Sequence, residues 1–175
     1  MNYMAITQPD INNGLGCRVT LWVSGCPNHC PGCHNPETWD KLAGKKFDEE
    51  AKNKLMKYLS KPYIKGLTLS GGEPLDFRDS DKCEVLLDIV KTVKTSMPDK
   101  DIWVFSGFTL RELLSHPSTT SILDYVDNLV DGRFEQDKAD KSLAFRGSKN
   151  QKIYTNYTYE SVTGPDNWVD QTEKF

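Results

Sequence analysis

RVTLWVSGCPNHCPGCH, residues 18–34, runs from a β-rich segment directly into three closely spaced cysteines. Its branched and aromatic residues favour a strand over residues 18–23, and the glycine and proline that follow end that strand. Cys26, Cys30 and Cys33 have the spacing C-x3-C-x2-C. Three thiolates this close together can bind three of the four irons of a cube-shaped iron–sulfur cluster. The fourth iron would then be open to a ligand that is not protein, which indicates a reactive site.

Strand-like and helix-like segments alternate beyond this cysteine loop, which we define as residues 24–34. The predicted elements are, in order, residues 48–59 (helix), 64–70 (strand), 81–96 (helix), 101–105 (strand), a short helix from Thr109, 125–130 (strand) and 135–142 (exposed loop). Alternation at this interval predicts βαβ units with a parallel sheet, so we expect an α/β fold. In such folds the carboxyl ends of the strands meet at one edge, where ligand sites gather. The organisation therefore indicates an enzyme.

The whole chain limits the class of protein. Its 175 residues suit one core, and we expect a single domain, residues 1–175. The net charge of −3 gives no reason to expect a nucleic-acid partner. No apolar run approaches the roughly 20 residues that span a bilayer, and the N-terminus lacks a signal-peptide pattern, so a cytoplasmic location without membrane contact is expected. Thiols stay reduced there, and five cysteines, three of them clustered, favour metal binding over disulfides.

A structural zinc site is the main alternative for the cysteine loop. Zinc takes four ligands, usually from two separated pairs, whereas this chain has one compact trio. The available fourth ligands are His29, His34, Cys17 and Cys83. The two histidines are cramped by their positions, and Cys83 lies on the apolar stripe of a predicted helix. Spacing alone therefore favours an iron–sulfur cluster over zinc, with redox-active thiols as a third interpretation.

A second motif, Gly71-Gly72-Glu73-Pro74, follows the next predicted strand. A cysteine loop after the first strand together with Gly-Gly-Glu after the second resembles the radical S-adenosylmethionine (SAM) superfamily. The resemblance implies a shortened, partial (β/α) barrel with a parallel sheet. It also implies a 4Fe–4S cluster held by the three loop cysteines, with SAM bound to the open iron through its amino nitrogen and carboxylate. The reduced cluster would cleave SAM to a 5′-deoxyadenosyl radical, which takes hydrogen from a substrate.

The same resemblance assigns the contacts to SAM. The segment Gly71-Gly72-Glu73 would meet the amino group, because glycines let the backbone approach closely. Gly32, Cys33 and His34 would lie against the adenine, and Ser106 is the best-placed candidate for the ribose. The superfamily commonly has an aromatic residue at the position of Gly32, so one wall of the adenine site is expected to be missing.

Further segments resemble the family of activating components of anaerobic ribonucleoside-triphosphate reductase, the smallest glycyl-radical activases. The matching segments are residues 13–18, 30–39, 70–75, 130–134 and 146–153. Glycine before the third cysteine is usual in this family. The resemblance implies a protein substrate, a glycine near the C-terminus of the large reductase subunit, which would become a glycyl radical. It also implies an electron donor such as reduced flavodoxin or a thiol system.

The sequence leaves alternatives open at two points. Arg146, Ser148, Asn150 and Gln151 are expected either to shape the docking site for the partner or to form a hydrogen-bonded turn. The same SAM chemistry would also suit a small-molecule substrate. A non-catalytic, zinc-stabilised interaction module is the third hypothesis, although such a module has no need of Gly-Gly-Glu on the next strand.

Overall fold

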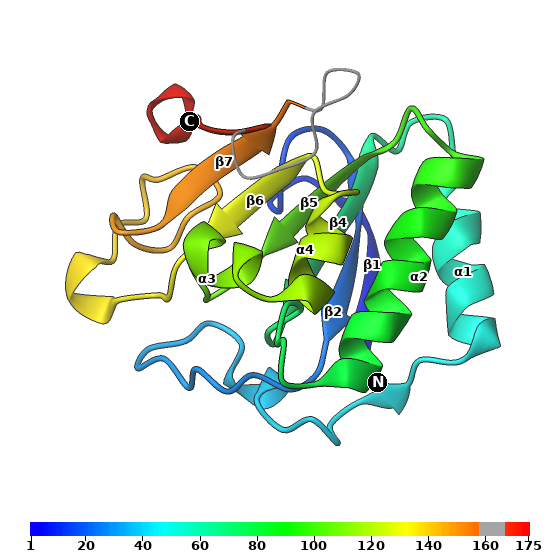
Figure 1. The fold of residues 1–175 in the computed structure, drawn as a ribbon, viewed down its shortest axis with the longest axis horizontal. Coiled ribbons are helices and arrows are strands. Elements are labelled where there is room, and N and C mark those ends of the chain that lie inside the picture. The colour runs from blue at the N-terminus through cyan, green and yellow to red at the C-terminus, as the bar shows by residue number, and fades with distance from the viewer. Residues whose placement is uncertain (158–166) are drawn as a thin grey trace.

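The computed structural model describes residues 1–157 and 167–175. These residues form one sheet of eight strands in the order β3-β1-β2-β4-β5-β6-β7-β8 (Figure 1). The strands are β1 (Asn2–Asp10), β2 (Arg18–Val23), β3 (Lys45–Lys46), β4 (Gly66–Gly71), β5 (Asp101–Phe105), β6 (Asn128–Asp131), β7 (Lys152–Asn156) and β8 (Trp168–Asp170). The helices are α1 (Glu49–Leu59), α2 (Ser80–Ser96), α3 (Leu110–Leu114) and α4 (Pro117–Leu123), with 3-10 turns at Pro36–Thr38, Gln136–Lys138 and Thr172–Lys174.

The predicted helices are confirmed, and their N-termini follow ordinary capping rules. α1 begins after Asp48, whose side chain accepts a hydrogen bond from the Ala51 N–H at 3.0 Å. α2 begins after Asp79 in the same way, and Thr109 with Glu112 forms the capping box of α3. The sequence pattern does not predict α4. Within the described ranges, no helix is both long and apolar enough to cross a membrane.

The expected parallel barrel is wrong, because the sheet is mixed. In the described part of the chain, parallel pairing is confined to the four central strands β2, β4, β5 and β6. The outer strands β1, β3, β7 and β8 all pair antiparallel. Helical crossovers connect the four parallel strands, as parallel pairing requires. β1 and β2 are joined by residues 11–17 alone, and residues 132–151 between β6 and β7 contain only a 3-10 turn. Because these connections have no α-helix, each one joins two antiparallel strands. The mixed sheet therefore makes this an α/β protein only in a loose sense.

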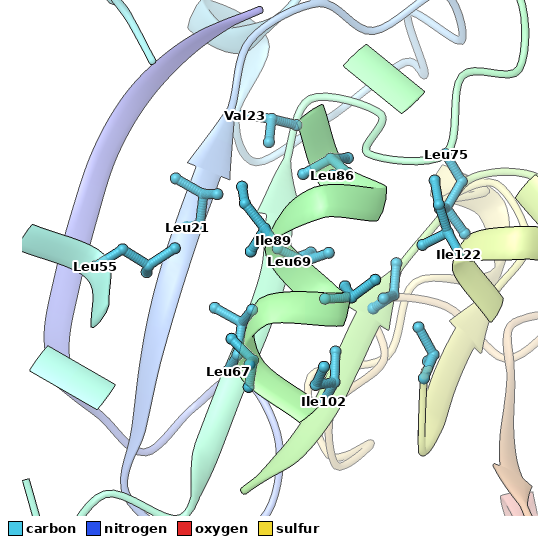
Figure 2. Close-up of a cluster of buried hydrophobic side chains, with 14 of the residues drawn as sticks. Leu21, Val23, Leu55, Leu67, Leu69, Leu75, Leu86, Ile89, Ile102 and Ile122 are labelled. Atoms are coloured by element: carbon cyan, nitrogen blue, oxygen red, sulfur yellow. The ribbon is translucent and has the colours of Figure 1, made fainter. Parts of the chain in front are cut away.

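One face of the sheet packs against the helices. Alternate side chains of the parallel strands meet the helices there in the main core (Figure 2). Leu67 and Ile102 come from the sheet, and Leu55 and Leu86 come from α1 and α2. Cys83 is 4% exposed in this core, as its position on the apolar stripe predicts. The fold therefore separates Cys83 from the partly exposed cysteines of the loop.

The intervening side chains lie on the opposite face of the sheet. Trp103, Val130 and Ile153 form a second buried cluster, against which Phe145 and Phe175 pack. Trp103 and Ile102 are neighbours in β5 but belong to different clusters, as the two-residue period of a strand requires. The segment between β6 and β7 and the C-terminal residues therefore help to cover this second face.

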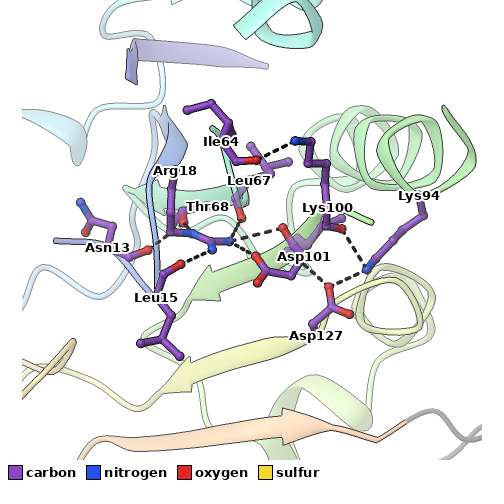
Figure 3. A network of polar contacts seen from close by, with 11 residues as sticks. Asn13, Leu15, Arg18, Ile64, Leu67, Thr68, Lys94, Lys100, Asp101 and Asp127 are labelled. Carbon is purple, nitrogen blue, oxygen red and sulfur yellow. Dashed lines mark hydrogen bonds and ion pairs between the residues drawn. The ribbon is translucent and has the colours of Figure 1, made fainter. Parts of the chain in front are cut away.

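A buried polar network closes the amino ends of the parallel strands (Figure 3). The Arg18 side chain is fully buried, donates to Thr68 Oγ1 at 2.7 Å and forms an ion pair with Asp101 at 2.6 Å. Lys94 and Asp127 form a second ion pair next to it, also at 2.6 Å. Because side chains fill this end of the strands, the end that is open to ligands is the opposite one, which carries the cysteine loop.

Candidate functional site at the carboxyl ends of the strands

An open cavity of about 460 Å³ lies at the carboxyl ends of the parallel strands. Its lining includes residues of the cysteine loop after β2 and residues 71–73 at the carboxyl end of β4, which we call the Gly-Gly-Glu turn. Ser106 and Gly107 after β5, and Gly132 and Phe134 after β6, complete this set of strand ends. The predicted meeting of the carboxyl ends of the strands at one edge of the sheet is thus confirmed. The volume lies in the range of small-molecule sites in proteins.

Backbone hydrogen bonds hold the cysteine loop at its start and at its last turn. The Gly25 N–H donates to the Thr38 carbonyl at 2.7 Å, and the Cys33 N–H donates to the Cys30 carbonyl at 3.1 Å. All three loop cysteines are free thiols of intermediate exposure, and all three line the cavity. The structure therefore brings the predicted cluster ligands to one wall of the site.

Backbone N–H groups point at the cysteine sulfurs. Burial raises the pKa of the Cys26 and Cys30 thiols, because a thiolate is disfavoured away from water. Backbone N–H groups oppose this rise at both sulfurs, that of Phe134 in the case of Cys30. Cys33 Sγ accepts a hydrogen bond from the Asn35 N–H at 3.4 Å. Donors directed at sulfur suit metal-bound thiolates and influence the potential of a cluster.

The Gly-Gly-Glu turn packs directly against the start of the cysteine loop. The Gly72 N–H donates to the Val23 carbonyl and the Glu73 N–H to the Gly25 carbonyl, both at 2.8 Å. A Cβ on Gly72 would lie only 2.6 Å from the Gly25 oxygen. Gly71 has a φ of +105°, in the region that favours glycine. Both glycines are therefore needed for the two segments to meet.

Glu73 is the buried carboxylate of the site, with 1% of its surface exposed. Its Oε1 accepts hydrogen bonds from Ser106 Oγ at 2.7 Å and the Leu75 N–H at 3.0 Å. Its Oε2 accepts from the Gly107 N–H at 2.7 Å and Asn28 Nδ2 at 3.2 Å. Burial raises the pKa of Glu73 to about 6, although several of these donors oppose the rise. The carboxylate thereby joins the turn to the cysteine loop and to the end of β5.

The space beside Gly32 is filled from the segment after β6. A Cβ on Gly32 would lie 3.2 Å from the Gln136 side-chain amide and 3.4 Å from the Phe134 ring. The His34 and Phe134 rings are 5.7 Å apart between centroids. Phe134 and Gln136 therefore occupy the space beside Gly32, where the sequence leads us to expect a gap. The sequence places Phe134 in one of the segments that match the family, residues 130–134, and Gln136 in a predicted exposed loop, but neither pattern reports a contact with Gly32.

The hydroxyl of Ser106 already has two protein partners. It donates to Glu73 Oε1 and accepts a hydrogen bond from the Phe108 N–H at 3.1 Å. Ser106 is 5% exposed and lines the cavity. Its contact with a ribose stays a prediction, whereas its support of Glu73 is a feature of the structure.

The segment around Gln151 forms a hydrogen-bonded turn, one of the two expectations for it. Gln151 Oε1 accepts from the Gly147 and Ser148 N–H groups at 2.8 and 3.1 Å, and its Nε2 donates to the Gly132 carbonyl at 2.9 Å. Gly147, Gln151 and Arg146 also line the cavity. The turn thus holds the cationic side chain of Arg146 at the cavity wall.

Asn28 and Lys82 contribute to the site although the sequence analysis does not single them out. Asn28 lies between two loop cysteines and reaches Glu73, and Lys82 Nζ donates to the Gly25 carbonyl at 2.9 Å. Position inside the loop is the only sequence signal for Asn28. Lys82 has no signal, because a lysine in the first turn of a helix normally belongs to its solvated side.

The residues present fit a cluster bound by the loop cysteines. The three free thiols line one cavity, and N–H groups are directed at their sulfurs. Over residues 1–157 and 167–175, no three His, Cys, Asp or Glu side chains are grouped so that they would hold a single metal ion. A cube-shaped cluster does not require its ligands to surround one ion, because each thiolate binds a separate iron.

Comparison with models of protein families gives the class of this protein. Residues 12–154 match the family described as 4Fe-4S single cluster domain. The match contains the cysteine loop, the Gly-Gly-Glu turn and all four parallel strands. The chain therefore belongs to this family of iron–sulfur proteins.

Curated relatives narrow this class. The chain is 50% identical over 156 residues to the anaerobic ribonucleoside-triphosphate reductase-activating protein of Pasteurella multocida. It is 44% and 40% identical, again over 156 residues, to the proteins of that name from Vibrio cholerae and Escherichia coli K12. The aligned part covers 88% of this chain and 97% or 98% of each relative. The chain belongs to the family of anaerobic ribonucleoside-triphosphate reductase-activating proteins.

Proposed function

We propose that this chain is an activating enzyme that uses a 4Fe–4S cluster and SAM to generate a glycyl radical on anaerobic ribonucleoside-triphosphate reductase. The observation that carries the proposal is the direct junction of the cysteine loop with the Gly-Gly-Glu turn at the wall of one cavity. The names of the relatives support the reductase as the target, and the family description supports the cluster.

Cys26, Cys30 and Cys33 are the proposed cluster ligands. The loop has no fourth cysteine, so one iron of a four-iron cluster would be left for a ligand from outside the protein. Burial limits the access of water to the sulfurs, and the backbone N–H groups directed at them oppose the cost of burying a thiolate. The loop therefore has what it needs to hold a cluster with one open position.

The Gly-Gly-Glu turn is the proposed site for the amino group of SAM. Gly71 and Gly72 bring bare backbone to the cavity, where carbonyl oxygens can accept hydrogen bonds from an ammonium. The four donors on Glu73 use both of its oxygens, so we assign it the roles of holding the turn and favouring a positive charge nearby. Glu73 is therefore not proposed to form a direct ion pair with the amino group of SAM.

The adenine is proposed to lie along Gly32, Cys33 and His34. Phe134 and Gln136 stand beside Gly32 and would form the wall that the glycine lacks. An aromatic face and an amide are both suitable neighbours for a purine. The chain's contribution here is therefore to orient SAM and to exclude water from it.

When bound, the cluster would supply one electron to break a carbon–sulfur bond of SAM, and the 5′-deoxyadenosyl radical released with methionine would take the α-hydrogen of the substrate glycine. An external donor such as reduced flavodoxin or a thiol system would return the electron. Partly exposed residues at the cavity wall, among them Asn13, Leu143 and Arg146, would face the reductase segment that carries the glycine. A cavity that is open on one side suits a protein segment that closes it.

The test is to incubate the reduced protein with SAM and the large reductase subunit under anaerobic conditions. We expect the doublet of a glycyl radical in the EPR spectrum, together with formation of 5′-deoxyadenosine. SAM cleavage without the doublet would favour a small-molecule substrate. About one zinc per chain and no iron would contradict the proposal as a whole.

A further inference from the structure

Lys82 is a buried lysine that the proposed function does not use. It lies in the first turn of α2, where a lysine normally extends into water, yet it is only 1% exposed. Its Nζ donates to the Gly25 carbonyl at 2.9 Å and to the Glu73 carbonyl at 3.1 Å. One carbonyl immediately precedes Cys26, and the other belongs to the Gly-Gly-Glu turn. A single ammonium therefore connects the two segments that build the site.

The Gly25 carbonyl is the common acceptor of this junction. It accepts the Glu73 N–H at 2.8 Å in addition to the ammonium of Lys82. Gly25 has a φ of +88°, and a Cβ there would lie 3.1 Å from Lys82 Nζ. The close approach of the lysine thus depends on glycine at this position. A movement of the ammonium would reach Cys26 through one peptide unit.

The same ammonium places a positive charge next to the cysteine loop. Lys82 and Cys26 together line a second cavity of about 450 Å³. Among the residues that the structure describes, no carboxylate lies within ion-pair distance of Lys82. Its charge is therefore not neutralised by a paired side chain, and it acts on the buried Glu73 carboxylate.

We propose that Lys82 is a positioning residue that fixes the cysteine loop against the Gly-Gly-Glu turn and eases reduction of the cluster. The inference rests on the proposed function, because the loop and the turn that Lys82 joins are the proposed sites of the cluster and of SAM. Losing the ammonium removes two charge-assisted hydrogen bonds at the junction. It also removes a positive charge that favours the reduced, more negative cluster.

Lys100 offers a matched control at the other end of the sheet. It is 7% exposed, and its Nζ donates to the carbonyls of Ile64 at 2.6 Å and Lys61 at 3.3 Å. It directly precedes β5, so it lies at the amino end of the strand, away from the cysteine loop. Lys82→Met and Lys100→Met each remove one buried ammonium from two backbone carbonyls. Both substitutions lower stability, but only the first touches the junction.

The experiment uses the anaerobically reconstituted proteins and measures three properties: iron per chain, SAM affinity from EPR titration of the reduced cluster, and the midpoint potential of the cluster. For Lys82→Met we expect full iron content, SAM binding at least about tenfold weaker and a lower potential. For Lys100→Met we expect the affinity and potential of the wild type. If Lys82→Met does not fold, Lys82→Gln and Lys100→Gln replace the pair, with a smaller effect of the same sign expected.

Equal SAM affinity and equal potential in the Lys82 and Lys100 variants would overturn the role of Lys82 while leaving the proposed function intact. A wild-type cluster whose EPR spectrum does not respond to SAM would instead overturn the proposed function, and the role of Lys82 with it. The EPR response of the wild-type cluster to SAM therefore distinguishes the two failures.

Discussion

Replacing Gly72 by alanine tests whether the site depends on close contact between the turn and the cysteine loop. The new Cβ would lie 2.6 Å from the Gly25 oxygen, whereas ordinary contacts begin at 3.4 Å. The two segments must therefore separate by about 0.8 Å, enough to stretch the Glu73–Gly25 hydrogen bond from 2.8 Å past its normal range. Overpacking of this kind costs about 1–3 kcal/mol of stability. A displacement near 1 Å at a reacting centre can cost about a hundredfold in rate.

The assay is anaerobic cleavage of SAM, followed as 5′-deoxyadenosine, in variants with measured iron content. We expect Gly72→Ala to keep its iron, to melt about 2–12 °C lower and to cleave SAM about ten- to a hundredfold more slowly. Gly66→Ala is the control, because its Cβ would overlap the Asp101 carbonyl oxygen at the other end of the same strand. It should lose stability without a comparable loss of cleavage per folded, iron-loaded chain. Wild-type cleavage by Gly72→Ala, or an equal loss in Gly66→Ala, would refute the reasoning.

Three further predictions follow from the same structure. Substituting any one loop cysteine by alanine should abolish SAM cleavage, whereas Cys83→Ala, in the helix-facing core, should leave it largely intact; an equal loss at Cys83 would show that the ligands are misassigned. Arg18→Met should lower the free energy of unfolding in urea by about 3–5 kcal/mol, because it removes the fully buried guanidinium that pairs with Asp101 and donates to Thr68 and to backbone carbonyls, and a cost under about 1 kcal/mol would contradict the network. Burial raises the pKa of Glu73 from 4.5 to about 6, so the folded, cluster-free protein favours the protonated carboxyl. The free energy of unfolding should therefore be highest below pH 4.5 and fall by about 2 kcal/mol as the pH rises through 6. Urea unfolding of wild type and Glu73→Gln at several pH values checks this, since the variant should lack that decrease and identical pH profiles would refute it.

The sequence predicts those parts of the fold whose residues carry a local period. β2, β4 and β5 are buried strands with β-rich composition, and α1 and α2 have apolar stripes with aspartate caps, so their positions are confirmed to within a few residues. β1 is partly exposed along its whole length and shows no clean alternation, which is why its pattern does not predict a strand. The direction of the outer strands depends on how their connections pack, and that has no signature in single residues.

The residues of the site likewise divide into those with a local sequence signal and those without one. The loop cysteines and the Gly-Gly-Glu turn are recognisable because their chemistry needs fixed residues at fixed local spacing. Lys82, Gln136 and Asn28 contribute through contacts with residues that are 57, 104 and 45 positions away, respectively, and a sequence pattern does not report such contacts. The wall beside Gly32 shows the consequence, since the glycine predicts a gap and a distant segment fills it.

We expect SAM to occupy the iron left open by the three loop cysteines. Electron–nuclear double resonance on the reduced cluster, with SAM labelled with nitrogen-15 at its amino group, tests this directly. We expect about four irons per chain and a hyperfine coupling to the labelled nitrogen that is lost when unlabelled SAM is used. A four-iron cluster that shows no coupling and an unchanged EPR spectrum with SAM would contradict the claim.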